Sequence, residues 1–390
     1  MKRFLTGCRI FTGEALLSGH GVLVANGRVE ALLPADAKPE GAEILRLSPD
    51  ALLTPGFLDL QVNGAGGVLF NETPTVAAAH RIAEAVRPFG VTGVLPTLIT
   101  DKKEALDAAC GITADAASVT GSGVLGIHVE GPFISKERKG VHNPDFIRAP
   151  SEEDLETLKA LANKLAPHNA RVLLTVAPEN VSDASLADLA KAGVVLAAGH
   201  TAATYERIEE ATHMGVTGFT HLGNAMPPVQ NRAPGPVAAA LAGRDTWCGL
   251  IADGHHIHPG LMKVMLAAKP AGKIFLVTDA MPPVGTDAET FILYGQTIYR
   301  RDGKLTTEDG TLAGADIDMA SAIRNCVKLL GQPLTEALRM ASLYPAAYLG
   351  LERTYGRIAP GFAADFAVIT EDVEPLETWV QGAVVWSKDG

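Results

Sequence analysis

Two neighbouring stretches of the chain, VVLAAGHT at residues 194–201 and VTGFTH at residues 216–221, carry the pattern that decides the fold. Each is a short run of apolar, β-branched and small residues that ends in a histidine. Runs that are apolar at nearly every position are typical of strands buried on both faces of a parallel sheet. The two stretches therefore predict buried parallel strands with an imidazole at the end of each.

Six further runs of the same kind extend this pattern, and a helical stretch usually follows each. The eight runs lie at residues 57–62, 91–97, 124–129, 171–176, 194–198, 216–220, 247–252 and 274–278. Eight strand–helix units in one region predict a (β/α)8 barrel, the TIM-type fold of the α/β class. A chain of 390 residues is long enough for such a barrel and a smaller domain.

The two ends of the chain have a different pattern. Asn26-Gly27 separates two short apolar runs, as in a tight β-hairpin turn, and the tail has β-like runs at 364–369 and 382–386. We predict one small β-sandwich domain built from residues 1–53 and 357–390. The catalytic barrel then occupies residues 54–356. Within it, residues 320–350 are predicted to be helical, with Pro333 and Pro345 near helix starts.

Composition narrows the class of protein. The net charge of −11 repels nucleic acid and anionic membranes, so neither is expected as a partner. No apolar run reaches the length of a membrane span, and no secretory signal is recognised near the start. The 4 cysteines lie far apart, which suits a reducing compartment and argues against a thiolate metal cage. We therefore expect a cytoplasmic protein.

Function in a (β/α)8 barrel belongs to the C-terminal ends of the strands, and here acids and imidazoles follow several of them. Glu130, His200 and His221 follow three separate runs. Catalytic zinc takes three such nitrogen and oxygen ligands, and Fe²⁺ accepts the same donors. A lone histidine in this position is more often a hydrogen-bonded barrel residue. Three donor groups at three strand ends favour a metal site.

Asp279 closes the apolar run at residues 274–278. A carboxylate beside an activated water is well placed to act as general base and then to return the proton to a leaving amine. Elsewhere in the chain such an aspartate would be read as an N-cap or loop residue. His128 lies two residues before Glu130 on the same side of its strand, and we predict a buried, hydrogen-bonded residue below the metal.

The motifs at these positions resemble those of a known family, the N-acetylglucosamine-6-phosphate deacetylases of the amidohydrolase superfamily. The resemblance covers essentially the whole chain. The matching motifs are PGFLD at 55–59, HVEGPF at 128–133, GHT at 199–201, HLGNAM at 221–226, VTDA at 277–280, TLAG at 311–314 and GFAAD at 361–365. The HxEGP and HxxNAM pair is the most specific, since the others occur across the superfamily.

The resemblance implies a role for each matching residue. Glu130, His200 and His221 would be the metal ligands, Asp279 the proton acceptor and donor, and His142 the group that polarises the acetyl carbonyl. The implied substrate-binding residues are Val141, His142, Asn224, Ala225, Arg232, Asp253, His256, Leu312, Ala313 and Gly314. Arg232 and His256 suit a phosphate, although Arg232 lies in a proline-rich loop and would equally suit a solvent-exposed surface position.

The chain departs from the superfamily pattern at one point. Most amidohydrolases have two histidines after the first barrel strand, which help to bind a second metal, whereas this chain has Gln61 and Asn63. We therefore expect one divalent metal ion per subunit, with Zn²⁺ preferred and Fe²⁺ or another divalent ion as alternatives. The resemblance also implies a homodimer.

The expected reaction is hydrolysis of N-acetylglucosamine 6-phosphate to glucosamine 6-phosphate and acetate. One alternative is another metal-dependent amidohydrolase, acting on a cyclic amide or an acyl amino acid, because fold alone does not fix the substrate. A second alternative is a non-catalytic barrel that binds a sugar phosphate. The four groups Glu130, His200, His221 and Asp279 together count against this second alternative.

Overall fold

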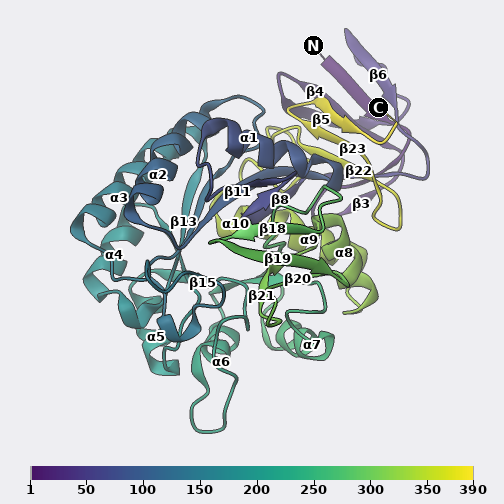
Figure 1. Ribbon diagram of the computed structural model, residues 1–390. Coiled ribbons are helices and arrows are strands. Elements are labelled where there is room, and N and C mark those ends of the chain that lie inside the picture. The colour runs from purple at the N-terminus through teal and green to yellow at the C-terminus, as the bar shows by residue number, and fades with distance from the viewer. Residues whose placement is uncertain (1, 390) are drawn as a thin grey trace.

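The computed structural model describes residues 2–389 and contains the predicted barrel (Figure 1). Its eight parallel strands, in chain order around the sheet, are β8 (Phe57–Val62), β11 (Val91–Ile99), β12 (Gly126–Glu130), β13 (Arg171–Val176), β14 (Val195–Ala198), β15 (Val216–Phe219), β16 (Trp247–Ile251) and β17 (Ile274–Val277). Each strand falls on one of the eight predicted runs. The prediction of a (β/α)8 barrel is confirmed.

The barrel closes where the first and last strands meet. Val62 and Ala280 form a parallel bridge, and the Asp279 N–H donates to the Gln61 carbonyl at 2.9 Å. Every residue of β8 and β11 is buried, because one face of each strand packs into the barrel and the other against helices. Closure therefore brings the strand end that holds Gln61 next to the strand end that holds Asp279.

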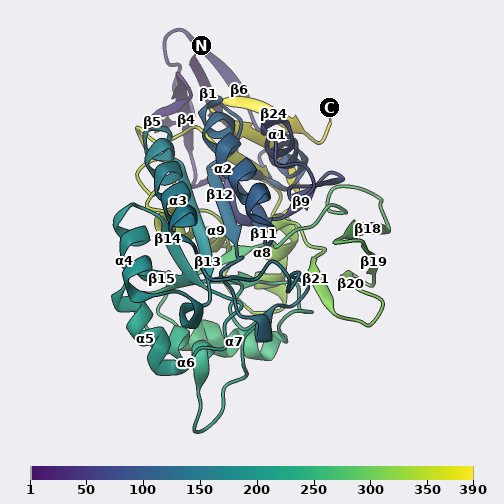
Figure 2. The same ribbon diagram turned by 60° about the vertical axis from the view of Figure 1, so that its left-hand side comes forward.

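Helices surround the barrel, as Figures 1 and 2 show. They are α1 (Val76–Ala85), α2 (Lys103–Ser118), α3 (Glu152–Leu165), α4 (Asp183–Lys191), α5 (Tyr205–His213), α6 (Gly235–Ala242), α7 (Pro259–Ala268), α8 (Met319–Lys328), α9 (Leu334–Ala341) and α10 (Leu343–Tyr348). Thr75, Ser151, Ser182 and Thr204 cap four of them, each accepting a backbone N–H. Pro333 precedes α9 and Pro345 lies in α10, as predicted.

The two ends of the chain come together in two packed sheets beside the barrel (Figure 1). One sheet contains β1 (Lys2–Thr6), β4 (His20–Ala25), β5 (Arg28–Pro34) and β6 (Ala42–Arg46). The other contains β2 (Arg9–Phe11), β3 (Leu16–Leu17), β7 (Leu52–Pro55), β22 (Phe366–Ile369), β23 (Pro375–Val380) and β24 (Ala383–Ser387). Val22, Leu53 and Phe366 are buried in their shared core. Asn26 and Gly27 form the predicted tight turn, with φ of 51° and 73°.

Four strands between β17 and α8 were not predicted from the sequence. They are β18 (Thr290–Leu293), β19 (Gln296–Arg301), β20 (Lys304–Thr306) and β21 (Leu312–Ala315), and we call them the flap sheet. Figure 2 shows the flap sheet on the side of the barrel opposite α4 and α5. Its residues Leu293, Ile298 and Leu305 pack with Ile99 and Met281 at the barrel mouth. A further small hairpin there comprises β9 (Gly64–Ala65) and β10 (Val68–Leu69).

Helix length and hydropathy also bear on membranes. Among residues 2–389, none of the helices combines the length and apolar character needed to cross a bilayer.

Candidate active site

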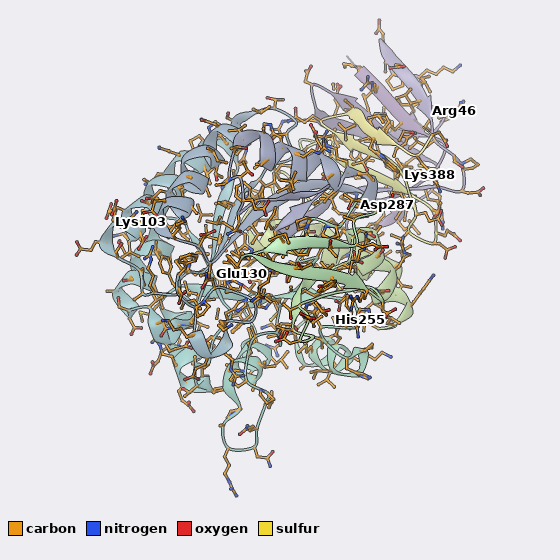
Figure 3. All side chains as sticks on the ribbon, viewed as in Figure 1. Arg46, Lys103, Glu130, His255, Asp287 and Lys388 are labelled. Atoms are coloured by element: carbon orange, nitrogen blue, oxygen red, sulfur yellow. The ribbon has the colours of Figure 1, made fainter. Side chains whose placement is uncertain are left out.

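The three predicted metal ligands converge inside the mouth of the barrel, and we call Glu130, His200 and His221 the metal triad. Figure 3 places Glu130 near the middle of the ring of helices, well inside Lys103. Its Oε1 lies 3.2 Å from His200 Nε2 and 2.9 Å from His221 Nε2, and the two imidazole nitrogens are 3.0 Å apart. All three side chains are buried. Three nitrogen and oxygen ligand atoms this close to one another would fit one cation between them.

His142 forms a second combination with two of these groups. Glu130, His142 and His200 each offer a ligand atom within 4.8 Å of the others, and the rings of His142 and His200 are 4.3 Å apart. The His221 nitrogen is closer to both Glu130 and His200, at 2.9 and 3.0 Å. His142 is instead held through its Nδ1, which lies 2.7 Å from Thr100 Oγ1. The shorter distances favour the triad that includes His221.

Backbone strain collects at this end of the barrel. Residues 2–389 contain 10 non-glycine residues with positive φ, and four of them are His200, His221, Ala225 and Asp279. Such a conformation costs about 1–3 kcal/mol at each position and persists only where the surrounding structure enforces it. These four residues are thus held in place by the barrel and not by local preference.

Hydrogen bonds beneath and beside the triad fix its orientation. His200 Nδ1 lies 2.8 Å from the Arg138 carbonyl, which accepts its N–H when Nε2 is the ligand atom. His128 is completely buried and bonds to Thr175 Oγ1 at 2.8 Å, so the prediction of a buried, hydrogen-bonded residue is confirmed. Burial lowers the pKa of His128 to about 4, so this ring is neutral near pH 7.

Asp279 follows β17 and faces the triad from the closing strand. Burial, and after it the charge of Glu130, raises its pKa to about 6, while the charges of His221 and His256 act in the opposite direction. Burial would also raise the pKa of Glu130, but hydrogen bonds from His200 and His221 hold it well below its usual range. The two carboxyl groups therefore differ, with Glu130 ionised and Asp279 able to exchange a proton near neutral pH.

Gln61 and Asn63, which stand where most amidohydrolases have two histidines, donate hydrogen bonds to the carboxylates of Glu130 and Asp279. Gln61 Nε2 donates to Glu130 Oε2 at 3.1 Å and to Asp279 Oδ1 at 3.0 Å. Asn63 Nδ2 donates to the same Asp279 oxygen at 2.6 Å. Neutral amide donors stabilise the anionic form of Asp279 but are weak metal ligands.

A cavity of about 370 Å³ opens from the triad. Its walls contain the triad, Asp279, Asn63 and most predicted substrate-binding residues, namely Val141, His142, Asn224, Ala225, His256, Leu312 and Gly314. A larger groove of about 640 Å³ lies beside it and shares Gly140, Val141, His142 and Thr311 with it. The groups with metal-binding and acid–base chemistry line the smaller cavity, which we take as the candidate active site.

Two family models match this chain. The amidohydrolase family model matches residues 52–385, and a model described as the NagA composite domain matches residues 4–48. The chain belongs to the amidohydrolase family. Members of this family depend on metal, and the buried Glu/His cluster of this amidohydrolase is able to bind one.

Two curated relatives and one solved structure are similar to this amidohydrolase. The N-acetylglucosamine-6-phosphate deacetylase of Haemophilus influenzae is 35% identical over 384 residues, covering 98% of this chain and 99% of the relative. The N-acetylgalactosamine-6-phosphate deacetylase of a Shewanella species is 37% identical over 337 residues, covering 86% and 84%. The crystal structure of N-acetylglucosamine-6-phosphate deacetylase from Pasteurella multocida has a TM-score of 0.93 at 35% identity, covering 98% and 99%.

Three residues predicted to bind substrate do not line the cavity of this amidohydrolase. Arg232 is exposed in the loop between β15 and α6, which extends away from the barrel in Figure 1. Ala313 is completely buried behind Leu312 and Gly314, because alternate residues of β21 face opposite sides. Asp253 contacts a cavity residue without lining the cavity itself: its Oδ2 lies 2.6 Å from His256 Nδ1 and orients that ring.

Other groups at the amidohydrolase site were missed from the sequence. Ile99, Met281 and Thr311 line the cavity. Tyr294 reaches from the flap sheet and donates its hydroxyl to the Thr100 carbonyl, next to His142. Asp302-Gly303, a favoured pair for a two-residue hairpin, was the sequence signal that could have revealed this sheet.

Proposed function

We propose that this amidohydrolase hydrolyses the acetamide of N-acetylglucosamine 6-phosphate to give glucosamine 6-phosphate and acetate. The observation that carries the proposal is one cavity holding the metal triad, the raised-pKa carboxyl of Asp279 and the polar pair Asn224 and His256. The relatives with this activity in their names match almost the whole chain. A cyclic amide without an anionic group would have no use for the polar end at His256.

The roles of the protein side chains follow from their positions. Asp279 takes the proton from the attacking water and later donates it to the departing nitrogen, a transfer that a pKa of about 6 favours in both directions. His142 donates a hydrogen bond from its free Nε2 to the acetyl oxygen as charge develops there. Burial lowers the pKa of His142, so the ring acts as a neutral donor.

One divalent ion per subunit, with Zn²⁺ preferred over Fe²⁺, would be held by Glu130, His200 and His221. When bound, it would lower the pKa of water and polarise the carbonyl. The amides of Gln61 and Asn63 support a single ion, since both donate N–H groups toward the carboxylates.

The sugar phosphate would lie at the other end of the cavity. Asn224, the backbone at Ala225 and His256 are the polar groups there, and Asp253 fixes the ring of His256. In a chain of net charge −11 this end needs another cation for a phosphate. We assign that role to Arg232 of a neighbouring copy in a homodimer, because Arg232 is exposed on an extended loop and does not reach its own cavity.

Mixed dimers test the shared site. A heterodimer of one Arg232→Ala subunit and one Asp279→Asn subunit keeps a single intact site, and we expect about half of the wild-type activity from it. Both parent homodimers should be nearly inactive at low substrate concentration. A monomer by light scattering, or a heterodimer no more active than its parents, would remove Arg232 from the proposal.

The galactosamine epimer is the second candidate substrate, because one of the similar relatives is named for it. The first experiment measures acetate release from N-acetylglucosamine 6-phosphate, its galactosamine epimer and unphosphorylated N-acetylglucosamine, each with and without a chelator. We expect rapid, chelator-sensitive release from the glucosamine phosphate and little from the free sugar. No release from any of the three, by protein that contains metal, would reject the function.

The four cysteines are consistent with a cytoplasmic enzyme, which we propose. Cys8, Cys110, Cys248 and Cys326 are all buried and unpaired.

A further inference from the structure

The two histidines of the metal triad differ in the hydrogen-bond partner of Nδ1, the ring nitrogen that is not the proposed ligand atom. His200 Nδ1 has the Arg138 carbonyl at 2.8 Å. His221 Nδ1 is buried and has no hydrogen-bond partner among the described residues. Metal-binding histidines almost always donate this second N–H, which fixes the ring and the tautomer. His221 therefore needs a partner that is not a protein atom in direct contact.

A small cavity lies beneath His221 inside the barrel. Its volume is about 10 Å³, and its walls include His221, His128, Thr220, Gly249 and Tyr348. That volume is close to what one water molecule requires. A water is held in such a place only where at least two polar groups face it, and Thr220 is already engaged with Thr175 at 2.6 Å.

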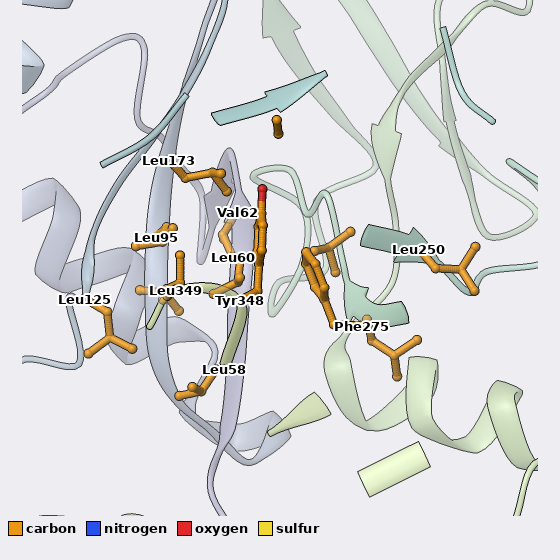
Figure 4. Packing of buried hydrophobic residues seen from close by; sticks show 14 of the residues in the cluster. Leu58, Leu60, Val62, Leu95, Leu125, Leu173, Leu250, Phe275, Tyr348 and Leu349 are labelled. Carbon is orange, nitrogen blue, oxygen red and sulfur yellow. The ribbon is translucent and has the colours of Figure 1, made fainter. Parts of the chain in front are cut away.

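Tyr348 supplies the second polar group. It ends α10, below the barrel, and its hydroxyl is also buried without a hydrogen-bond partner. In Figure 4 the ring stands beside Leu60 and Val62 and stacks on Phe275, with the oxygen at the Val62 end. Gly218 makes room for it, since a Cβ at that position would lie 2.3 Å from the Tyr348 oxygen.

Burial raises the pKa of Tyr348, and Thr217, the other hydroxyl near it, acts in the opposite direction. The Thr217 hydroxyl is instead directed at the Leu196 carbonyl, at 3.5 Å, and no bond of acceptable geometry joins it to Tyr348. Two residues that line one water-sized cavity thus each carry a buried polar atom without a partner.

We propose that one buried water in this cavity bridges the Tyr348 hydroxyl and His221 Nδ1, and that Tyr348 is a positioning residue for the metal triad. The water accepts the Nδ1 hydrogen, so Nε2 carries the lone pair with which His221 would hold the metal together with Glu130, whose Oε1 lies 2.9 Å from that nitrogen. The proposal rests on the assignment of His221 as a metal ligand under the proposed function.

Tyr348→Phe tests this role, because it removes only the oxygen and keeps the ring packed on Phe275. We expect Zn²⁺ affinity, measured by competition with a chromophoric chelator, to fall 10–100-fold. The control is Tyr344→Phe, also in α10, whose hydroxyl donates to Glu336 at 2.8 Å, away from the barrel interior. This control should leave Zn²⁺ affinity unchanged even if it lowers the melting temperature.

The melting temperature of the metal-free protein gives a second, independent readout. If the Tyr348 hydroxyl has no partner, removing it should stabilise the protein. Unchanged Zn²⁺ affinity together with a raised melting temperature would overturn the inference. If Tyr348→Phe does not fold, a high-resolution crystal structure of the wild type decides: a water within hydrogen-bond distance of both atoms is expected, and an ordered site without one overturns it. Wild-type protein that binds no Zn²⁺ would instead reject the metal site of the proposed function.

Discussion

The mouth of the barrel and the flap sheet that covers it line the same cavity but are built in opposite ways. At the mouth, Glu130, His200, His221 and Asp279 are buried, and three of them have positive φ. In the flap sheet, Thr290 and Ile292 are exposed, and the two non-glycine residues with positive φ, Tyr294 and Asp302, both lie in hairpin turns.

The difference separates the residues that carry the chemistry, at the mouth, from the flap sheet, which covers them. Residues at the mouth are placed by eight strands that come from distant parts of the chain, so each position is over-determined. The flap sheet is a local meander attached to the barrel by an apolar cluster, by the Tyr294 hydroxyl and by the Ala315 N–H, which donates to the Asp279 carbonyl at 2.9 Å. We therefore expect substitutions at the mouth to change chemistry by large factors and substitutions in the flap sheet to change access by small ones.

The largest effect is expected at Asp279. Asp279→Asn keeps the size of the side chain, but an amide cannot act as the base that accepts a proton from water. We therefore expect kcat for acetate release to fall by about 10²–10⁴-fold. Metal content and melting temperature should stay near the wild-type values. Asp287→Asn, on the exposed segment before the flap sheet, is the control. Activity within tenfold of wild type would mean that another group is the base.

Two histidine substitutions distinguish the two possible triads. His221→Ala should abolish stoichiometric metal binding, because it removes a donor 2.9 Å from Glu130. His142→Ala should retain one metal and lose about 10²–10³-fold in kcat through the missing carbonyl donor. Metal analysis of both dialysed variants checks this. The opposite result, with metal lost only from His142→Ala, would establish Glu130, His142 and His200 as the ligands.

The same contrast explains how far sequence reasoning reached. Buried parallel strands are recognisable as continuous apolar runs, and the residue that follows each run must lie at the mouth. The location of Glu130, His200, His221 and Asp279 could therefore be predicted. The flap strands alternate and are short, so they carry a weak signal. Arg232 and Asp253 were predicted to line the cavity because position in the sequence does not show which way a loop runs, as for Arg232. Nor does it show that a residue acts through a neighbour, as Asp253 does through His256.

A substitution in the helical layer, away from both regions, provides a reference for stability alone. Burial would raise the pKa of Asp154, but hydrogen bonds from Arg148 and Ser151 at the start of α3 lower it to about 2. The ionised form therefore stabilises the fold above about pH 4, and this contribution is lost as pH falls toward 2. Asp154→Asn should cost about 1–2 kcal/mol in urea unfolding at pH 7. Its activity should match wild type, and a destabilisation that stayed constant between pH 7 and pH 2 would contradict the ionic cause.

The smallest effect is expected where the two regions meet, at the bond from Tyr294 to the Thr100 carbonyl. Thr100 also holds His142 through its hydroxyl, at 2.7 Å, so the contact joins the flap sheet to a group at the mouth. Tyr294→Phe removes one hydrogen bond, worth about 1 kcal/mol, and should speed hydrogen exchange of the flap strands about fivefold. Exchange at β12 and β15 should not change, because the closed barrel holds them independently.

Tyr299→Phe, in the same sheet, is the matched control. Equal exchange in the Tyr294 variant and wild type would mean that the apolar cluster and the Ala315–Asp279 backbone bond hold the sheet without the Tyr294 hydroxyl.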